Sequence, residues 1–85
     1  MKIVFHKKFT KRFDVLPKKI QEQFYERLTI FGISQFHPLL NNHILHHPYE
    51  GCRSINVNSN LRALFETISD TITFIRIDTH SNLYK

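Results

Sequence analysis

The side chains best suited to chemistry lie in the last third of the chain, on or just beyond the predicted strands. They are Arg53, Arg62, Arg76, His80 and Tyr84. An arginine fork can hold an anion through two parallel hydrogen bonds, and a histidine can exchange protons near neutral pH. Each of these residues taken alone is better explained by a structural role; Arg76, for example, could form an ion pair with Glu66 or Asp78 at the rim of the sheet. Their convergence on one predicted sheet favours a functional site.

Metal binding and cysteine catalysis fit the sequence less well. His43, His46 and His47 lie close together, but the chain has one cysteine and no HExxH or other zinc-ligand spacing. Cys52 is at the predicted start of a strand, where it is better interpreted as a small packed side chain than as a nucleophile. No glycine-rich phosphate loop and no acid/base pair of carboxylates stand out. We therefore expect neither a metal ion nor a cofactor.

The N-terminal half of the chain predicts a strand followed by a helical hairpin. Residues 2–5 (Lys-Ile-Val-Phe) predict a short opening strand, and residues 7–16 carry apolar side chains at spacings of four and three. Pro17 suits the start of a second helix, and Gly32 is a plausible end for it. The polar positions of the first helix form a basic face that comprises Lys7, Lys8, Lys11 and Arg12.

The C-terminal half predicts a loop and three strands. Prolines and asparagines interrupt residues 33–49, whereas residues 52–58, 61–67 and 71–77 are typical of strands with short turns between them. Such connections favour an antiparallel meander. The predicted fold is α+β in the order β-α-α-β-β-β, with both helices on one sheet face. The other face should be at least partly exposed, and we expect the site there.

Composition limits the class of protein. The 85 residues provide for one domain, residues 1–85, and the net charge of +5 favours a polyanionic partner such as nucleic acid or an acidic protein surface. A single cysteine cannot form an internal disulfide, which fits a reducing cytoplasm. We expect no signal peptide and no membrane association, because the apolar runs are short.

Several of these features occur in an order that is typical of a known family. A basic helical hairpin is followed by a Gly-x-Arg strand at residues 51–53, by Asn-Leu-Arg-Ala-Leu-Phe at residues 60–65, and by Thr-His-Ser-x-Leu-Tyr at residues 79–84. This order resembles the RelE/ParE superfamily of type II toxin–antitoxin toxins over essentially the whole chain. It is closest to the YafQ branch, whose members end in a similar Gly-Thr-His-x-x-Leu-Phe. The resemblance implies a small antiparallel sheet against two helices, and an endoribonuclease that cuts messenger RNA in the ribosomal decoding site.

The resemblance also implies site residues. His80 falls where YafQ-like toxins have a catalytic histidine, and Tyr84 where the family has a functional aromatic residue. Arg76 matches an arginine of YafQ, and His43 aligns with another of its histidines. Arg62 matches an arginine of the RelE strand that YafQ lacks.

Three positions depart from the YafQ pattern. Asn56 stands where YafQ has a histidine, Asn60 where it has an aspartate, and Leu61 where it has a tryptophan. The expected site is therefore a hybrid, in which a RelE-like Arg62 offsets the missing YafQ groups.

The chemistry that the resemblance implies is attack of a 2′-OH on the adjacent phosphate without a metal ion. His80 would be one member of the acid/base pair and His43 the other, with their order left open. Arg62 and Arg76 would clamp the phosphate, and Tyr84 would stack on or orient a base. The residues expected to bind RNA backbone are Lys7, Lys8, Lys11, Arg12 and Arg53.

Two other functions remain open from the sequence. One is a ParE-like gyrase poison without a nuclease site, and the other is a degenerate member of the superfamily without activity. The expected partners are messenger RNA, the ribosome and a cognate antitoxin with an acidic or amphipathic segment that folds on binding. The toxin–antitoxin complex is expected to be a higher-order oligomer.

Overall fold

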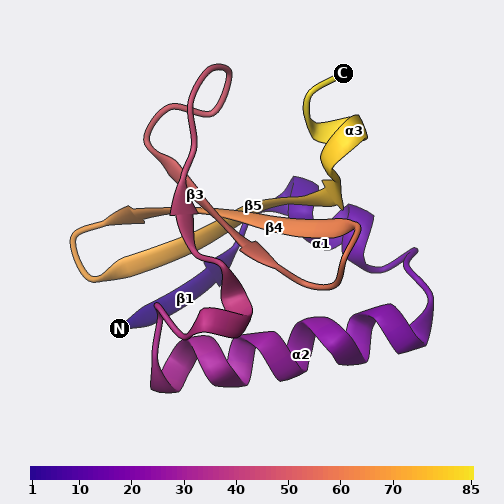
Figure 1. The fold of residues 1–85 in the computed structure, drawn as a ribbon, viewed down its shortest axis with the longest axis horizontal. Coiled ribbons are helices and arrows are strands. Elements are labelled where there is room, and N and C mark those ends of the chain that lie inside the picture. The colour runs from indigo at the N-terminus through magenta and orange to yellow at the C-terminus, as the bar shows by residue number, and fades with distance from the viewer.

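The computed structural model describes all residues from Met1 to Lys85 and contains one five-stranded sheet in the order β1-β5-β4-β3-β2. The elements are β1 (Lys2–Phe5), α1 (Lys7–Phe13), α2 (Lys18–Ile33), the 3-10 turn η1 (Pro38–Leu40), β2 (His43–Ile44), β3 (Cys52–Asn56), β4 (Leu61–Ile68), β5 (Thr71–Thr79) and α3 (His80–Leu83). Figure 1 shows α2 beneath the sheet, with α3 and the loop between β2 and β3 standing on its opposite side. The predicted α+β fold is confirmed.

The predicted meander is present, and a parallel strand extends it. Strands β3, β4 and β5 pair antiparallel, as their short connections require, and β2 adds to β3. Strand β1 pairs with β5 in parallel, with Lys2 opposite Thr71. The sheet is therefore mixed, because the chain leaves β1 through the helical hairpin and returns to its side only at β5.

Phenylalanines dominate the core between the helices and the sheet. Phe9, Phe24 and Phe74 are almost fully buried, and their ring centroids lie 5.3–5.8 Å apart. Each such ring contributes on the order of 1.5–3 kcal/mol through burial. Helix α1 thereby lies along β5, and its basic face is held beside the C-terminal half of that strand.

A second, smaller hydrophobic cluster forms on the other face of the sheet. It consists of Leu45, Cys52, Leu64 and Leu83, with Tyr49 and Ile75 packed against it. Leu45 and Tyr49 come from the loop before β3, and Leu83 comes from α3. This cluster fixes α3 above the sheet, so the face that we expected to be at least partly exposed is covered over part of its area.

Several predicted boundaries are wrong by a few residues. Helix α1 ends at Phe13 rather than residue 16, because the residue before Pro17 is disfavoured in helical geometry. Gly32 lies within α2, which ends at Ile33. Strand β3 ends at Asn56 and β5 extends to Thr79, where it pairs with Leu61. The predicted loop contains η1 and β2.

Helix α3 was not predicted, because only four residues form it. Its first turn is held by a side-chain cap, in which the Thr79 hydroxyl accepts a hydrogen bond from the backbone N–H of Asn82 at 3.1 Å. None of the helices combines the length and the apolar character that crossing a membrane requires.

Candidate active site

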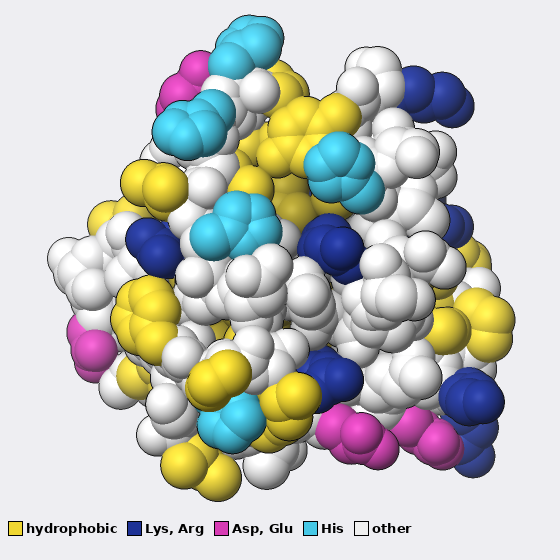
Figure 2. All heavy atoms as spheres, viewed as in Figure 1, with side chains coloured by type: hydrophobic (Ala, Val, Ile, Leu, Met, Phe, Trp, Pro, Cys, Tyr) yellow, Lys and Arg dark blue, Asp and Glu magenta, His cyan; other side chains and the backbone are white.

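A hollow of about 190 Å³ on the face opposite α1 and α2 brings four of the predicted site residues together. His43, Arg62, His80 and Tyr84 all line it, although they come from three strands or helices far apart in sequence. Its remaining lining residues are Asn41, Leu45, Ser54, Leu64 and Leu83. Figure 2 shows histidine and cationic side chains around a recess on this face whose inner surface is hydrophobic.

The pairing of the strands determines which residues form the floor of the hollow. Ser54 in β3 pairs with His43 in β2 on one side and with Leu64 in β4 on the other. Neighbouring paired residues project on the same side of a sheet, so these three side chains share one face. Arg62 lies two residues before Leu64 and therefore shares the same face.

Helix α3 forms the opposite wall of the hollow. The rings of His80 and Tyr84 lie 4.9 Å apart, and the Tyr84 ring meets that of Tyr49 edge-on at 5.5 Å. The Tyr49 hydroxyl donates a hydrogen bond to the carbonyl of Leu83 at 2.8 Å. These contacts, with Leu83 only 4% exposed, hold a short helix that could not persist by itself.

The His43 ring has a defined hydrogen-bond partner. Its Nδ1 lies 2.8 Å from the backbone carbonyl oxygen of Asn41. A carbonyl oxygen can only accept, so Nδ1 must carry a hydrogen, and in the neutral ring the lone pair is then on Nε2. His43 is thus held in the tautomer in which Nε2 can accept a proton.

Arg62 is anchored through one nitrogen and remains available through the others. Its Nη1 donates to the carbonyls of Asn58, Ser59 and Leu61 at 2.9, 3.3 and 3.1 Å. No carboxylate lies within ion-pair distance of it, and neither Nε nor Nη2 makes a hydrogen bond within the chain. The positive charge is therefore fixed in position without being neutralised.

Arg76 does not line the hollow. The structure therefore only partly brings together the four side chains that we expected at one site, which are Arg62, Arg76, His80 and Tyr84. Its Nη1 lies 3.4 Å from the Tyr49 hydroxyl, and Tyr49 in turn packs against Tyr84. Arg76 instead lines two neighbouring depressions. Arg76 pairs with Leu64 of the hollow across β4 and β5, but its guanidinium contacts Tyr49 and lines the depressions beyond it.

The larger of these depressions, about 530 Å³, gathers most of the predicted basic face. Its lining residues are Lys8, Lys11, Arg12, Val15, Arg76 and Asp78. Lys7 is not among them. We call this group the basic groove. It adjoins the hollow through Asp78, Thr79 and His80, which are consecutive in the chain.

Asp78 anchors the basic groove. Its Oδ1 accepts hydrogen bonds from Arg12 at 3.3 Å, from the N–H of Thr79 at 2.8 Å and from the Asn82 amide at 3.0 Å. Burial alone would raise the pKa of Asp78, but the hydrogen bonds from Asn82 and Thr79 and the charge of Arg12 outweigh it and lower that pKa below its ordinary value. The carboxylate therefore stays ionised and joins α1 to the start of α3.

Arg53 lies apart from both the hollow and the basic groove, so the prediction that places it with the other arginines is wrong. It alternates with Ser54 and shares the side of Ile55, which is in the main core. Its Nε donates to Asn42 Oδ1 at 2.8 Å, and its guanidinium lies 5.2 Å from the centre of the Phe36 ring. The alternation in the sequence could have revealed this, because Arg53 and Ile55 are two residues apart.

One residue of the hollow, Ser54, and one residue beside it, Tyr49, gave no signal in the sequence. Ser54 is an ordinary polar residue of an alternating strand, and Tyr49 belongs to a stretch that predicts only a loop. In the structure the Ser54 side chain lies in the floor of the hollow. Tyr49 contacts Arg76, Leu83 and Tyr84. Both roles depend on contacts between distant segments.

The remaining candidates for chemistry have structural explanations. Burial and the nearby charge of Glu66 raise the pKa of the Cys52 thiol, which disfavours a thiolate nucleophile. No group of three or more His, Cys, Asp or Glu side chains is arranged to hold a metal ion. His47 lies in an exposed loop, 3.4 Å from Glu50.

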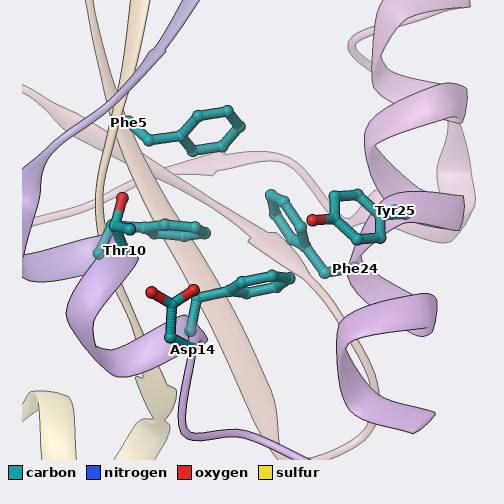
Figure 3. A pocket seen from close by; sticks show the side chains of 7 residues that line it. Phe5, Thr10, Asp14, Phe24 and Tyr25 are labelled. Carbon is teal, nitrogen blue, oxygen red and sulfur yellow. The ribbon is translucent and has the colours of Figure 1, made fainter. Parts of the chain in front are cut away.

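A separate aromatic groove of about 160 Å³ lies between β1, α1 and α2. Figure 3 shows Phe5, Phe24 and Tyr25 around it, with Thr10 and Asp14 as its polar lining residues. It contains no acid/base pair and no cation among its lining residues. The groove is an open extension of the phenylalanine core, and we do not assign chemistry to it.

Comparison with known proteins identifies the fold. No protein-family model and no curated protein sequence matches the chain. Among solved structures, YafQ from E. coli strain BL21(DE3) superposes with a TM-score of 0.78 at 18% identity, covering 98% of this chain and 97% of that one. The YoeB/ParE toxin from Agrobacterium tumefaciens gives 0.78 at 14% identity, covering 94% and 99%.

A chain of the RelB-RelE antitoxin-toxin complex from Methanococcus jannaschii is also similar. Its TM-score is 0.73 at 22% identity, and the match covers 95% of this chain and 94% of that one. These matches cover nearly the full length of this chain and of each matched chain. The chain therefore has the RelE-like fold that the YafQ, YoeB and RelE toxins share.

Proposed function

We propose that this protein is the toxin of a type II toxin–antitoxin system and acts as a metal-independent endoribonuclease on messenger RNA. The observation that carries the proposal is the convergence of His43, Arg62, His80 and Tyr84 on one hollow. Two histidines can transfer protons at neutral pH, an unpaired arginine can stabilise a phosphate, and a tyrosine ring can stack on a base. The RelE-like fold of the chain is consistent with this function.

The proposed reaction is attack of a ribose 2′-oxygen on the adjacent phosphorus. The P–O5′ bond breaks, which leaves a 2′,3′-cyclic phosphate on one fragment and a 5′-OH on the other. His43 takes the 2′-OH proton on Nε2, since its Nδ1 is bound to Asn41. His80 donates a proton to the departing 5′-oxygen. The attack and the departure occur on opposite sides of the phosphorus, which suits histidines from two walls of one hollow.

Arg62 has the role of stabilising the phosphorane. Its free Nε and Nη2 can donate to the two non-bridging oxygens, and the turn carbonyls of residues 58, 59 and 61 hold its Nη1 in place. A donor that is already fixed pays little reorganisation cost when charge develops.

Arg76 has a different role in this proposal. Together with Lys8, Lys11 and Arg12 it lines the basic groove, where it can hold a phosphate next to the one that is cut. Arg12 is partly neutralised by Asp78, so the two lysines and Arg76 carry most of the attraction. The groove thus binds RNA backbone without reading its sequence.

An antitoxin is proposed as the protein partner, and the ribosome as the place where the message is presented, both in the cytoplasm. Solved structures of similar fold include the DinJ-YafQ toxin-antitoxin complex of E. coli, with a TM-score of 0.75 at 18% identity. For this chain, an acidic segment that folds over the basic groove would suit its charge.

Cleavage of a translated message, mapped by primer extension, tests the proposal. The wild-type protein should cut, and His80→Ala should lose about two to four decades of rate with an unchanged circular dichroism spectrum. His47→Ala is the matched control, because this exposed histidine lies outside the hollow and should leave cleavage unchanged.

A supercoiling assay with DNA gyrase, run beside the cleavage assay, tests the alternative function as a gyrase poison. Inhibition of gyrase without RNA cleavage would replace the nuclease by a ParE-like poison. Absence of both activities in the folded wild-type protein would identify a degenerate member.

A further inference from the structure

The floor of the hollow holds a polar atom that the protein leaves without a partner. Ser54 is 2% exposed, and its Oγ makes no hydrogen bond. The only other such side-chain atom is Oδ1 of Asn56, two residues further along the same face of β3 and opposite Arg62. Buried polar groups in folded proteins are almost always hydrogen-bonded, because leaving one unpaired costs free energy. Two unpaired groups on one strand beside a hollow point to a ligand.

The walls above Ser54 decide what kind of group can reach it. Leu45, Leu64 and Leu83 are all buried and line the inside of the hollow. A phosphate placed among leucines would lose its hydration without compensation. The imidazole side chains of His43 and His80 are exposed instead, which leaves the phosphate at the mouth of the hollow.

The size and shape of the hollow favour one flat ring. Its volume of about 190 Å³ is below that of sites for drug-sized ligands, so it does not take a whole nucleotide. Tyr84 provides an aromatic face at the wall. Apolar sides, an aromatic surface and a polar floor together match an unpaired nucleobase, which has a flat apolar face and a polar edge.

We propose that the hollow is a nucleobase subsite in which the Ser54 hydroxyl hydrogen-bonds the polar edge of an inserted base. This rests on the proposed function, because RNA supplies the base next to the phosphate that is cut. The hydroxyl can both donate and accept, so it can pair with either a donor or an acceptor on the edge of a base. The subsite makes this enzyme select its cleavage position by base identity, and Ser54 is a specificity-determining residue.

The test measures binding of nucleotides separately from cleavage. Amide chemical shifts of the protein are titrated with AMP, GMP, CMP, UMP and, as a probe without a base, ribose 5-phosphate. Wild type should bind one of the four more tightly than the others, with shifts at Ser54 and Leu64. Ser54→Ala should reduce that preference by about three- to tenfold, the effect of one hydrogen bond, and leave ribose 5-phosphate binding unchanged.

Two variants control the experiment. Thr73→Ala removes a hydroxyl from the same sheet face outside every hollow and should change nothing. Ser54→Cys keeps the volume of the side chain with a weaker donor, and it should behave like Ser54→Ala. Melting curves confirm that the variants fold.

The outcomes separate this inference from the nuclease proposal. Base-selective binding that depends on Ser54 supports the subsite even if no RNA is cut. Equal binding of all four nucleotides, or a preference that Ser54→Ala leaves intact, refutes the subsite even if cleavage is strong. A loss of stability in Ser54→Ala with unchanged preference would mean that the hydroxyl is satisfied by an ordered water, and this also refutes it.

Discussion

The Nδ1 atom of His43 lies 2.8 Å from the carbonyl oxygen of Asn41, and this contact fixes which nitrogen of the ring can take a proton. Asn41 is able to present its carbonyl in this way because it adopts a left-handed conformation, with φ of 47°, at the end of η1. Asparagine tolerates that conformation better than most residues. The end of a short turn therefore orients the proposed general base.

His43→Ala should lower the rate of RNA cleavage by about two to four decades, because a general base contributes that much. His43→Gln should be equally inactive, since an amide cannot take up the proton. The rate is measured in single-turnover cleavage of a labelled message, with His46→Ala as a control from the neighbouring loop. Cleavage by His43→Gln at the wild-type rate would exclude proton transfer at this position.

Arg62→Ala and Arg76→Ala should have different kinetic effects. Arg62 lines the hollow, so its loss should lower kcat, whereas loss of Arg76 from the basic groove should raise KM. Arg76→Ala should also reduce the dependence of log Kd on log salt by about 0.7 for single-stranded RNA. Arg53→Ala, on the other side of the sheet, is the matched control and should leave both constants unchanged. Equal effects of the two substitutions on kcat would place both arginines at one phosphate.

Tyr49→Phe should loosen α3 while leaving the sheet intact. The substitution removes the hydroxyl that donates to Leu83 and contacts Arg76, at a cost of about 0.5–1.5 kcal/mol. Amide hydrogen exchange at Tyr84, whose N–H is bound to the His80 carbonyl, should accelerate relative to amides of β4. The rate of RNA cleavage should also fall when α3 is loosened, because α3 carries His80. Unchanged exchange at Tyr84 would show that the Leu83 side chain alone holds the helix.

Asp78→Asn should lower the free energy of unfolding at neutral pH by about 1–2 kcal/mol, because it removes a carboxylate that accepts three hydrogen bonds. The pKa of Asp78 is lower in the folded state than in the unfolded chain. Its contribution to the free energy of unfolding is therefore complete above the pKa in the unfolded chain, which is near 4. That contribution is lost as the pH falls toward the pKa of Asp78 in the folded protein. Urea unfolding at pH 7 and pH 3 should therefore show a difference between wild type and variant that shrinks in acid. A difference that grows in acid would contradict this sign.

Cys52 should react slowly with thiol reagents in the folded protein. Its side chain is buried and the pKa of its thiol is raised, so little thiolate is present at neutral pH. Cys52→Ala should keep full cleavage activity and lose about 1 kcal/mol of stability through the volume removed from the small cluster. Alkylation is followed by mass spectrometry with and without urea. Fast alkylation of the native protein, with loss of cleavage, would restore Cys52 as a candidate nucleophile.

The sequence by itself determined the elements and their class. Apolar residues at helical spacing predict α1 and α2, and short turns on either side predict β4 and the β-branched strand β5. These patterns depend on local geometry, which is why the errors lie at element ends such as Phe13 and Asn56 and in the short elements η1, β2 and α3, which local patterns do not specify. The alternation that separates Arg53 from Ser54 was also readable, because side chains on a strand change face at each residue.

The tertiary structure alone decided which of the candidate groups meet. Arg62 and Arg76 look equivalent in the sequence, but Arg62 lines the hollow whereas Arg76 contacts Tyr49 and lines the basic groove. The unpaired hydroxyl of Ser54 and the tautomer of His43 likewise depend on what packs above and beside them. Such contacts join residues that are far apart in the chain, so a pattern within one segment cannot specify them.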